Sequence, residues 1–286
     1  MGEHRVAITG IGVVSPAGIG RDEFWQSILE GRRCVRRINA FDASKFPSSI
    51  AAQLDGFSAR KFVPKDYRKA VKVMARDIEI AVAAADLAFR DSGIVTRGIA
   101  ADSTTINPKR LGCNIGAGLI CSDLDELGSA VNTAVEDGRF DIRKWGSSGI
   151  DNLTPLWLLK YLPNMLACHV TIIHGAEGPS NTITCGDCSG LLSAAEAGSY
   201  VARGLVDAAV AGSAESKLNP MGLLRQALLK RLCTTRNEEP ETACRPFDAA
   251  HDGTVIGEGG GLVILEDMDR ARSRGATIYA LSLIHI

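Results

Sequence analysis

The chain has 286 residues, with 33 acidic and 32 basic side chains, a formal net charge of −1 and 45% hydrophobic residues. This composition is typical of a globular protein with a large core, and the near-zero charge excludes nucleic-acid or anionic-membrane binding driven by bulk electrostatics. No apolar run reaches membrane-spanning length and no early stretch reads as a secretory signal, so we expect a cytoplasmic protein. Its eight cysteines are then expected to be reduced, as small buried side chains.

The N-terminal third alternates between strand and helix patterns. Residues 5–9 predict a strand, and the glycine-containing residues 10–18 predict a loop after it. This loop fails as a dinucleotide-binding fingerprint, because the sixth position holds Ser15 followed by proline. Residues 22–30 predict a short amphipathic helix.

A long helix is predicted over residues 66–92, with Gly93 ending it. Apolar residues recur there at helical spacing: Val71, Met74, Ile78, Val82, Ala85 and Phe89. Residues 111–115 then predict a second core strand, and residues 122–135 a helix.

The middle of the chain predicts a loop over residues 146–152 and a helix over residues 156–167 that Pro163 must break or kink. His169 and His174 follow. We interpret both as buried, hydrogen-bonded histidines rather than catalytic ones.

Residues 178–204 predict a strand, a tight turn and a small-residue helix. Gly186 permits a sharp turn, and both Asp187 and Ser189 are favourable helix N-caps. A side chain at this strand–turn–helix elbow points outward at the positive end of the helix dipole, where backbone N–H groups bind anions. This position suits a nucleophile beside an oxyanion hole.

The last quarter predicts a buried strand over residues 207–212 and a helix over residues 221–230 that begins after Asn219. The glycine run at residues 257–261 is not a phosphate loop, because it lacks Gly-Lys-Ser/Thr and leads into a strand. A short helix over residues 267–274 and a strand from residue 277 complete the pattern.

From Val6 to Ala280 the chain resembles the beta-ketoacyl-acyl-carrier-protein synthases, the condensing enzymes of fatty acid and polyketide synthesis. The resemblance rests on the opening V-x-I-T-G-x-G-x-V-S-P-x-G, the elbow between G-P-S and S-G, and the run R-P-F-D-x-x-x-D-G-x-x-x-G-E-G. It implies an α/β, thiolase-like layered fold corresponding to the N-terminal half of a synthase, with acyltransferase chemistry. No cofactor or metal is implied. The implied partners are acyl carrier protein and a second subunit, as a homodimer or as a heterodimer with an active synthase.

In this family the elbow nucleophile is a cysteine, but a gapless match puts Asp187 at that position and Cys188 one residue later. A carboxylate is a weak nucleophile, and its acyl product would be a mixed anhydride prone to hydrolysis. The family's two histidine motifs and lysine are also absent from this sequence. We therefore expect a condensation-incompetent or chain-length-factor-like homologue. The alternative is an active parent synthase that uses Cys188.

The resemblance assigns two further sites. Leu119 falls where family members place an apolar residue that lines the acyl pocket, although ordinary core packing explains it equally well. Lys65, Arg68 and Lys69 fall where the family docks its acidic carrier protein. A solvated helix face is the simpler explanation for such a basic run.

A different class of function comes from Cys185 and Cys188, which form a C-x-x-C motif at the strand–helix junction. This layout is typical of a dithiol redox site.

We assign residues 1–280 to one synthase N-terminal domain that runs into a strand near residue 277, and residues 281–286 to a tail unlike the family. The tail suggests a truncated or appended reading frame. A chain of this kind is expected to expose apolar surface and to be poorly soluble.

Overall fold

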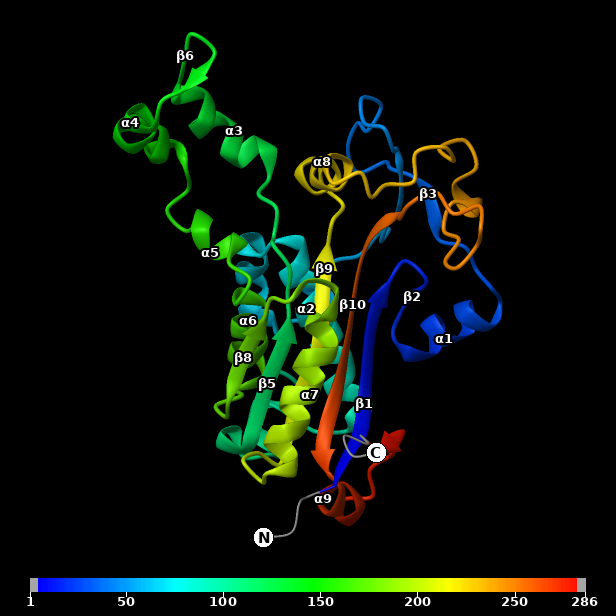
Figure 1. Ribbon diagram of the computed structural model, residues 1–286. Helices are drawn as coiled ribbons and strands as arrows, with labels where there is room; N and C mark the ends of the chain where they lie inside the picture. Colours follow the sequence, from blue (N-terminus) through cyan, green and yellow to red (C-terminus); the bar gives the residue numbers. More distant parts are fainter. Residues whose placement is uncertain (1–4, 282–286) are drawn as a thin grey trace.

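The computed structural model describes residues 5–281, and a mixed sheet forms its centre (Figure 1). The strand order is β11 (Ala280–Leu281), β1 (Val6–Ser15), β10 (Ile256–Asp267), β9 (Ala208–Ser216), β5 (Leu111–Gly116) and β8 (Ser180–Ile183). β10 pairs antiparallel with β1 and β9, whereas β5 pairs parallel with β9 and β8. The predicted α/β layered architecture is confirmed.

Two helices cover opposite faces of this sheet (Figure 1). α2 (Arg76–Ser92) packs on β1, β10 and β9, and α7 (Ser189–Ala202) packs on β9 and β5. The alternation of side chains along β9 explains both layers. Val210 belongs to the core cluster under α2, while Ala209 and Ala211 belong to the cluster under α7.

The first strand is longer than the sequence predicts, because β1 continues through most of the expected loop and ends at Ser15. Its glycines serve helix packing rather than a turn. A Cβ atom on Gly12 would lie 1.9 Å from the Ala84 carbonyl oxygen, and one on Gly10 would lie 2.3 Å from that of Ala88. The absence of side chains at these two positions lets α2 approach the strand closely.

The glycine run at residues 257–261 also lies inside a strand, β10, and not before it. A Cβ atom on Gly260 would lie 2.8 Å from Cγ2 of Ile80 on α2 and 2.9 Å from Cβ of Ala214 on β9. Glycines from β1 and β10 therefore let α2 lie closer to the sheet than side chains at these positions would allow.

The helix predicted over residues 66–92 is two segments: a 3₁₀ helix, η2 (Lys65–Val73), and α2. Met74 and Ala75 between them are extended, with ψ of 134° and 163°. The apolar positions that suggested one helix are nevertheless buried in both segments. Gly93 ends α2 in the left-handed conformation, as predicted.

The remaining helices and short strands connect these layers. The predicted loop over residues 146–152 is helical, and Pro163 separates two helices as expected. The elements not yet named are β2 (Gly18–Ile19), α1 (Arg21–Leu29), β3 (Val35–Arg37), β4 (Ile50–Ala52), η1 (Ala59–Lys61), η3 (Ala101–Ser103), η4 (Pro108–Arg110), α3 (Leu124–Thr133), β6 (Val135–Glu136), β7 (Arg139–Phe140), α4 (Ile142–Lys144), η5 (Trp145–Gly149), η6 (Ile150–Asn152), α5 (Trp157–Tyr161), α6 (Met165–His174), η7 (Gly186–Cys188), α8 (Pro220–Leu228), η8 (Pro240–Thr242) and α9 (Met268–Ser273).

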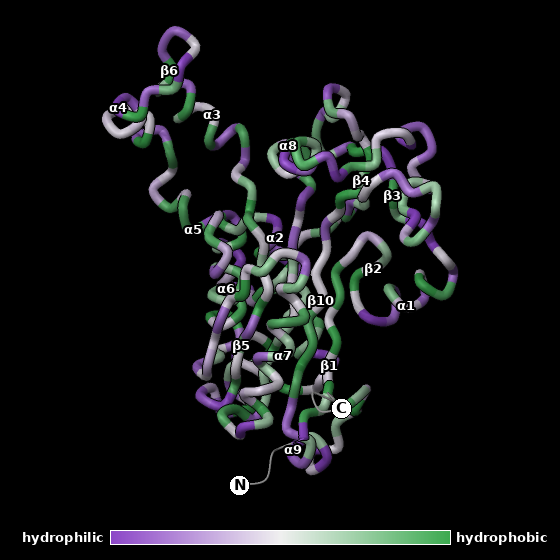
Figure 2. The backbone as a smooth tube through the Cα atoms, in the orientation of Figure 1, coloured by the Kyte–Doolittle hydropathy of each residue, from purple (hydrophilic) through white to green (hydrophobic). Residues whose placement is uncertain are grey.

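The segment from α3 to α5 extends away from the sheet (Figure 1). Figure 2 shows hydrophobic residues along β1 and β10 and polar residues at the tip of the β6–β7 hairpin. Several large apolar side chains are nonetheless exposed, among them Trp25, Ile28 and Leu29 on α1 and Leu158 on α5. The amphipathic helix predicted at α1 therefore leaves much of its apolar side in solvent.

All eight cysteines are free thiols, but only Cys113 and Cys233 are buried, so the expectation of buried cysteines is wrong for the others. Within residues 5–281, no helix has the length and apolarity needed to cross a bilayer. The expected strand near residue 277 begins at Ala280. Of the predicted tail, residues 282–286 lie outside the described part of the chain.

Candidate active site

The elbow predicted from the sequence is present at the end of β8. The chain leaves the strand, turns at Gly186 with a φ of 60°, passes through η7 and enters α7 at Ser189. The Ser189 hydroxyl accepts a 2.7 Å hydrogen bond from the Cys185 N–H and donates a 2.8 Å bond to the Gly186 carbonyl. Ser189 is buried, so these two bonds hold the turn against the start of the helix.

Close packing fixes where α7 begins. A Cβ atom on Gly116, at the end of β5, would lie 2.5 Å from the carbonyl carbon of Ser189. A Cβ atom on Gly190 would lie 2.5 Å from the Ser213 hydroxyl oxygen on β9. The start of α7 therefore packs closely on β5 and β9, and a residue with a side chain cannot take the place of Gly190 without a clash.

The elbow exposes three side chains that can carry chemistry: Cys185, Asp187 and Cys188. The N-cap of α7 is Cys188, and neither Asp187 nor Ser189 caps the helix as predicted. Ser189 closes the turn instead. Within the described residues, no hydrogen bond or ion pair engages the Asp187 carboxylate. It lies beside the N-terminal end of a 14-residue helix, where the dipole favours negative charge.

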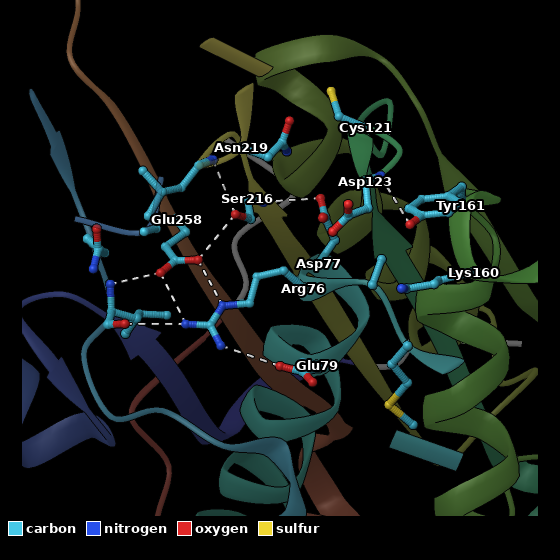
Figure 3. Close-up of a pocket in the computed structure, with 16 residues that line it drawn as sticks. Arg76, Asp77, Glu79, Cys121, Asp123, Lys160, Tyr161, Ser216, Asn219 and Glu258 are labelled. Carbon is cyan, nitrogen blue, oxygen red and sulfur yellow. Dashed lines mark hydrogen bonds and ion pairs between the residues drawn. The ribbon is translucent and has the colours of Figure 1, made fainter. Parts of the chain in front are cut away.

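A cavity of about 370 Å³ lies at the N-terminal end of α2 (Figure 3). Its walls come from α2, from the loop after β5, from α5, and from the ends of β9 and β10. Asp123, Tyr161, Ser216 and Asn219 are among the residues that line it. The cavity therefore gathers polar groups from segments far apart in the sequence.

An ion pair between the partly buried Arg76 and the buried Glu258 forms one wall. The Arg76 Nε atom lies 2.9 Å from the Glu258 carboxylate, and Arg76 also reaches Glu79 at 3.4 Å (Figure 3). Glu258 accepts further hydrogen bonds from the Leu54 N–H at 2.8 Å and the Ser216 hydroxyl at 3.2 Å. The Glu258 side chain is 3% exposed, and its contacts connect β10 to α2 and β9 in this wall of the cavity.

Asp77 is the second buried acid of the cavity. One of its oxygens accepts a 3.1 Å hydrogen bond from the Ser216 N–H. Burial raises the pKa of the Asp77 carboxyl from 3.8 to about 7, and the nearby Glu215 adds to the rise. Lys160 on the opposite wall is paired with Glu126 at 2.5 Å, so its charge is largely neutralised within the wall.

Sequence reasoning missed Arg76, Asp77, Ser216 and Glu258. A signal was available for two of them. Asp77 interrupts the apolar face of a helix, and Glu258 interrupts a strand made mainly of glycine and aliphatic residues. A charged residue at a position that must be buried needs a partner, although the sequence does not identify which one.

Leu119 lies in the loop after β5 with 62% of its surface exposed, so the alternative of core packing is wrong. It does not line the cavity at α2, whereas its neighbour Cys121 does. Arg225 on α8 donates hydrogen bonds to the Leu119 carbonyl at 3.4 Å and to the Cys121 sulfur at 3.1 Å. The loop is therefore held against α8.

Lys65, Arg68 and Lys69 are exposed on η2, the segment that leads directly into the cavity wall. None of the three forms an ion pair with any residue in the described part of the chain. Their charges are therefore not neutralised by ion pairs, and the exposed Asp66 lies in the same segment.

The two histidines of α6 are buried, as interpreted from the sequence. His169 shares a 2.8 Å hydrogen bond with the Tyr67 hydroxyl, and His174 shares a 2.7 Å bond with that of Thr96. Burial lowers the pKa of both, to about 3 for His174. Both histidines therefore hydrogen-bond to residues outside the elbow.

Comparison with known proteins agrees with this geometry. Residues 3–271 match the family model described as beta-ketoacyl synthase, N-terminal domain. The chain is 34% identical over 280 residues to 3-oxoacyl-(acyl-carrier-protein) synthase 2 of Vibrio harveyi, covering 98% of this chain and 62% of the relative. It is 35% identical to the actinorhodin polyketide putative beta-ketoacyl synthase 1 of Streptomyces coelicolor, covering 97% of this chain and 56% of the relative.

Solved structures give the same result. A beta-ketoacyl synthase from Burkholderia phymatum superposes with a TM-score of 0.78 at 29% identity, covering 97% of this chain and 62% of that one. A type II polyketide ketosynthase, solved in complex with its acyl-carrier protein, matches with a TM-score of 0.76 at 26% identity, over 98% of this chain and 62% of that one. The chain thus spans less than two thirds of these relatives.

Proposed function

The chain belongs to the beta-ketoacyl synthase family, and from this premise we propose that its protein acts in fatty acid or polyketide chain elongation with Asp187 at the nucleophile position. The observation that carries this proposal is the locked start of α7. Because Gly190 packs against Ser213 and Ser189 closes the turn, the S-G pair of the family motif cannot shift by one residue without a clash. This packing supports the gapless match, in which the nucleophile position holds the carboxylate.

A carboxylate at that position argues against condensation. An acyl group on Asp187 would be a mixed anhydride, which hydrolyses far more readily than the thioester a cysteine forms. We therefore propose a condensation-incompetent homologue, either chain-length-factor-like or limited to decarboxylation. Such a protein would act beside an active synthase as the second subunit, or as a homodimer. The exposed β8 edge and the 79% exposed Leu191 on α7 are compatible with either.

Acyl carrier protein is the proposed partner of the basic patch formed by Lys65, Arg68 and Lys69. The patch is exposed and has no ion-pair partner within the described residues, so its charge is available to an acidic surface. The related ketosynthase solved with its acyl-carrier protein supports acyl carrier protein as the partner, and the location of its docking site is our proposal. Leu119 remains our candidate for acyl contact, since its side chain is exposed. We also propose residues 1–280 as one domain, which agrees with the family match over residues 3–271.

A second candidate is an active synthase that uses Cys188. The observation in its favour is that Cys188 is exposed at the N-cap of α7, next to Asp187. A thiol there could accept an acyl group even if the family position holds a carboxylate.

Acyl-adduct mapping separates the two candidates. The reduced chain is incubated with a hexanoyl-pantetheine thioester and its peptides are analysed by mass spectrometry. We expect no stable adduct on the unmodified protein and a stable thioester in Asp187→Cys, with Cys244→Ser as the control for acylation of an exposed thiol elsewhere. A stable adduct on Cys188 that disappears in Cys188→Ser would overturn the first candidate and establish the second.

A further inference from the structure

Two exposed thiols flank the elbow turn, and the proposed function uses at most one of them. Cys185 is the N-cap of η7 and Cys188 is the N-cap of α7, so the single turn Gly186–Asp187 separates them. Both side chains are exposed.

The turn brings the Cα atoms of the two cysteines within the range that a disulfide can span. Residues that flank a two-residue turn have Cα atoms within about 7 Å, and disulfides join Cα atoms about 4.4–6.8 Å apart. Ser189 fixes the turn through bonds of 2.7 and 2.8 Å to Cys185 and Gly186. Neither bond uses a thiol, so both bonds can persist when the sulfur atoms join.

The other cysteines lack this arrangement. Cys113 and Cys233 are buried, Cys34 and Cys168 are half-buried, and the sulfur of Cys121 accepts a hydrogen bond from Arg225. Cys244 is exposed but lies in the loop after η8, far along the chain from the elbow. Cys185 and Cys188 are the pair that combines exposure with adjacency across one turn.

We propose that Cys185 and Cys188 form a reversible intramolecular disulfide, with small disulfides of the oxidised-glutathione class as the oxidant. One cysteine thiolate attacks a sulfur of oxidised glutathione, which forms a mixed disulfide and releases one glutathione thiolate. The second thiolate attacks the protein sulfur of that bond and releases the other glutathione. The two protons lost by the cysteines pass to the two glutathione thiolates, so two protein thiols are oxidised and one glutathione disulfide is reduced.

This disulfide would determine whether Cys188 at the elbow can react. In the oxidised state Cys188 cannot accept an acyl group. The disulfide also links the two ends of the turn that contains Asp187. The proposal does not depend on whether Asp187 or Cys188 occupies the nucleophile position. Acyl mapping on the reduced chain tests the proposed function, and thiol mapping on the oxidised chain tests this proposal.

The experiment equilibrates the 286-residue chain in glutathione buffers of increasing oxidised fraction. Free thiols are then blocked with N-ethylmaleimide in acid and the peptides are mapped. We expect the peptide with Cys185 and Cys188 to lose about 2 Da, without bound glutathione, in one transition that dithiothreitol reverses. In Cys185→Ser and Cys188→Ser the remaining thiol should retain glutathione at a level about tenfold above the unmodified protein, because no neighbouring thiol displaces it. Cys244→Ser is the matched control and should behave as the unmodified protein.

Two results would overturn the proposal. One is glutathione bound to both elbow cysteines with no intramolecular bond. The other is an elbow that stays reduced under conditions that load glutathione onto Cys244. Circular dichroism checks that each serine variant is folded, and if one is not, peptide mapping of the unmodified protein decides alone.

Discussion

Replacing Asp77 with asparagine should stabilise the protein, and the gain should grow as the pH rises. The Asp77 carboxyl has its pKa raised from 3.8 to about 7, mainly by burial. Above about pH 4 the unfolded chain releases this proton, whereas the folded chain retains it until about pH 7. The folded state therefore loses stability as pH rises between these two values. Asparagine carries no charge and can still accept the bond from the Ser216 N–H.

The pKa difference sets the magnitude. A rise of about three units corresponds to a penalty of about 4 kcal/mol at pH 8, since each unit is worth about 1.36 kcal/mol. At pH 5 the penalty is about 2 kcal/mol. The advantage of Asp77→Asn should therefore grow by about 2 kcal/mol between pH 5 and pH 8.

Pulse proteolysis in urea measures this difference at protein concentrations low enough to avoid aggregation. The pH dependence contributed by the buried His174, whose pKa is lowered to about 3, is common to both proteins and cancels in the comparison. Asp102→Asn, on an exposed 3₁₀ turn, is the matched control. An advantage that stays constant with pH, or a variant less stable than the parent at pH 8, would refute the reasoning.

Three further predictions follow from the packing and the surface. Gly12→Ala should lower the free energy of unfolding by about 3 kcal/mol, because its Cβ atom would meet the Ala84 backbone. The control is Gly261→Ala, whose Cβ atom meets nothing within 4 Å and which should change the urea midpoint little. Equal effects of the two substitutions would contradict the close packing of Gly12 on α2. Glu258→Ala should cost about 3 kcal/mol, since it leaves the partly buried Arg76 with only the 3.4 Å contact to Glu79. The control Glu30→Ala removes an exposed pair with Arg32 and should cost about 0–1 kcal/mol in the same assay, so a cost for Glu258→Ala no larger than this would count against the ion pair with Arg76. Changing Lys65, Arg68 and Lys69 together to glutamate should weaken binding of acyl carrier protein by about tenfold or more in surface plasmon resonance, and the binding should depend less on salt. The control Lys109→Glu changes an exposed lysine on another 3₁₀ turn and should bind as the parent does. An unchanged affinity of the triple variant would exclude this docking site.

The sequence alone determined the features that depend on local chemistry. β-branched and aliphatic runs identified the core strands, and Gly93 and Asn219 marked a helix end and a helix start as the structure has them. The strand–turn–helix elbow was also predictable, because Gly186 and the small-residue helix after it lie within one short segment. The family followed from motifs that span nearly the whole chain.

Only the tertiary structure decided the features that depend on close approach between distant segments. Gly10, Gly12 and Gly260 read as loop residues, yet they lie in paired strands, where α2 leaves no room for a Cβ atom. Arg76 and Glu258 are 182 positions apart, so no local pattern pairs them. Burial strengthens their attraction and raises the pKa of Asp77 by excluding water. That exclusion is a property of the packed cavity and not of any one segment.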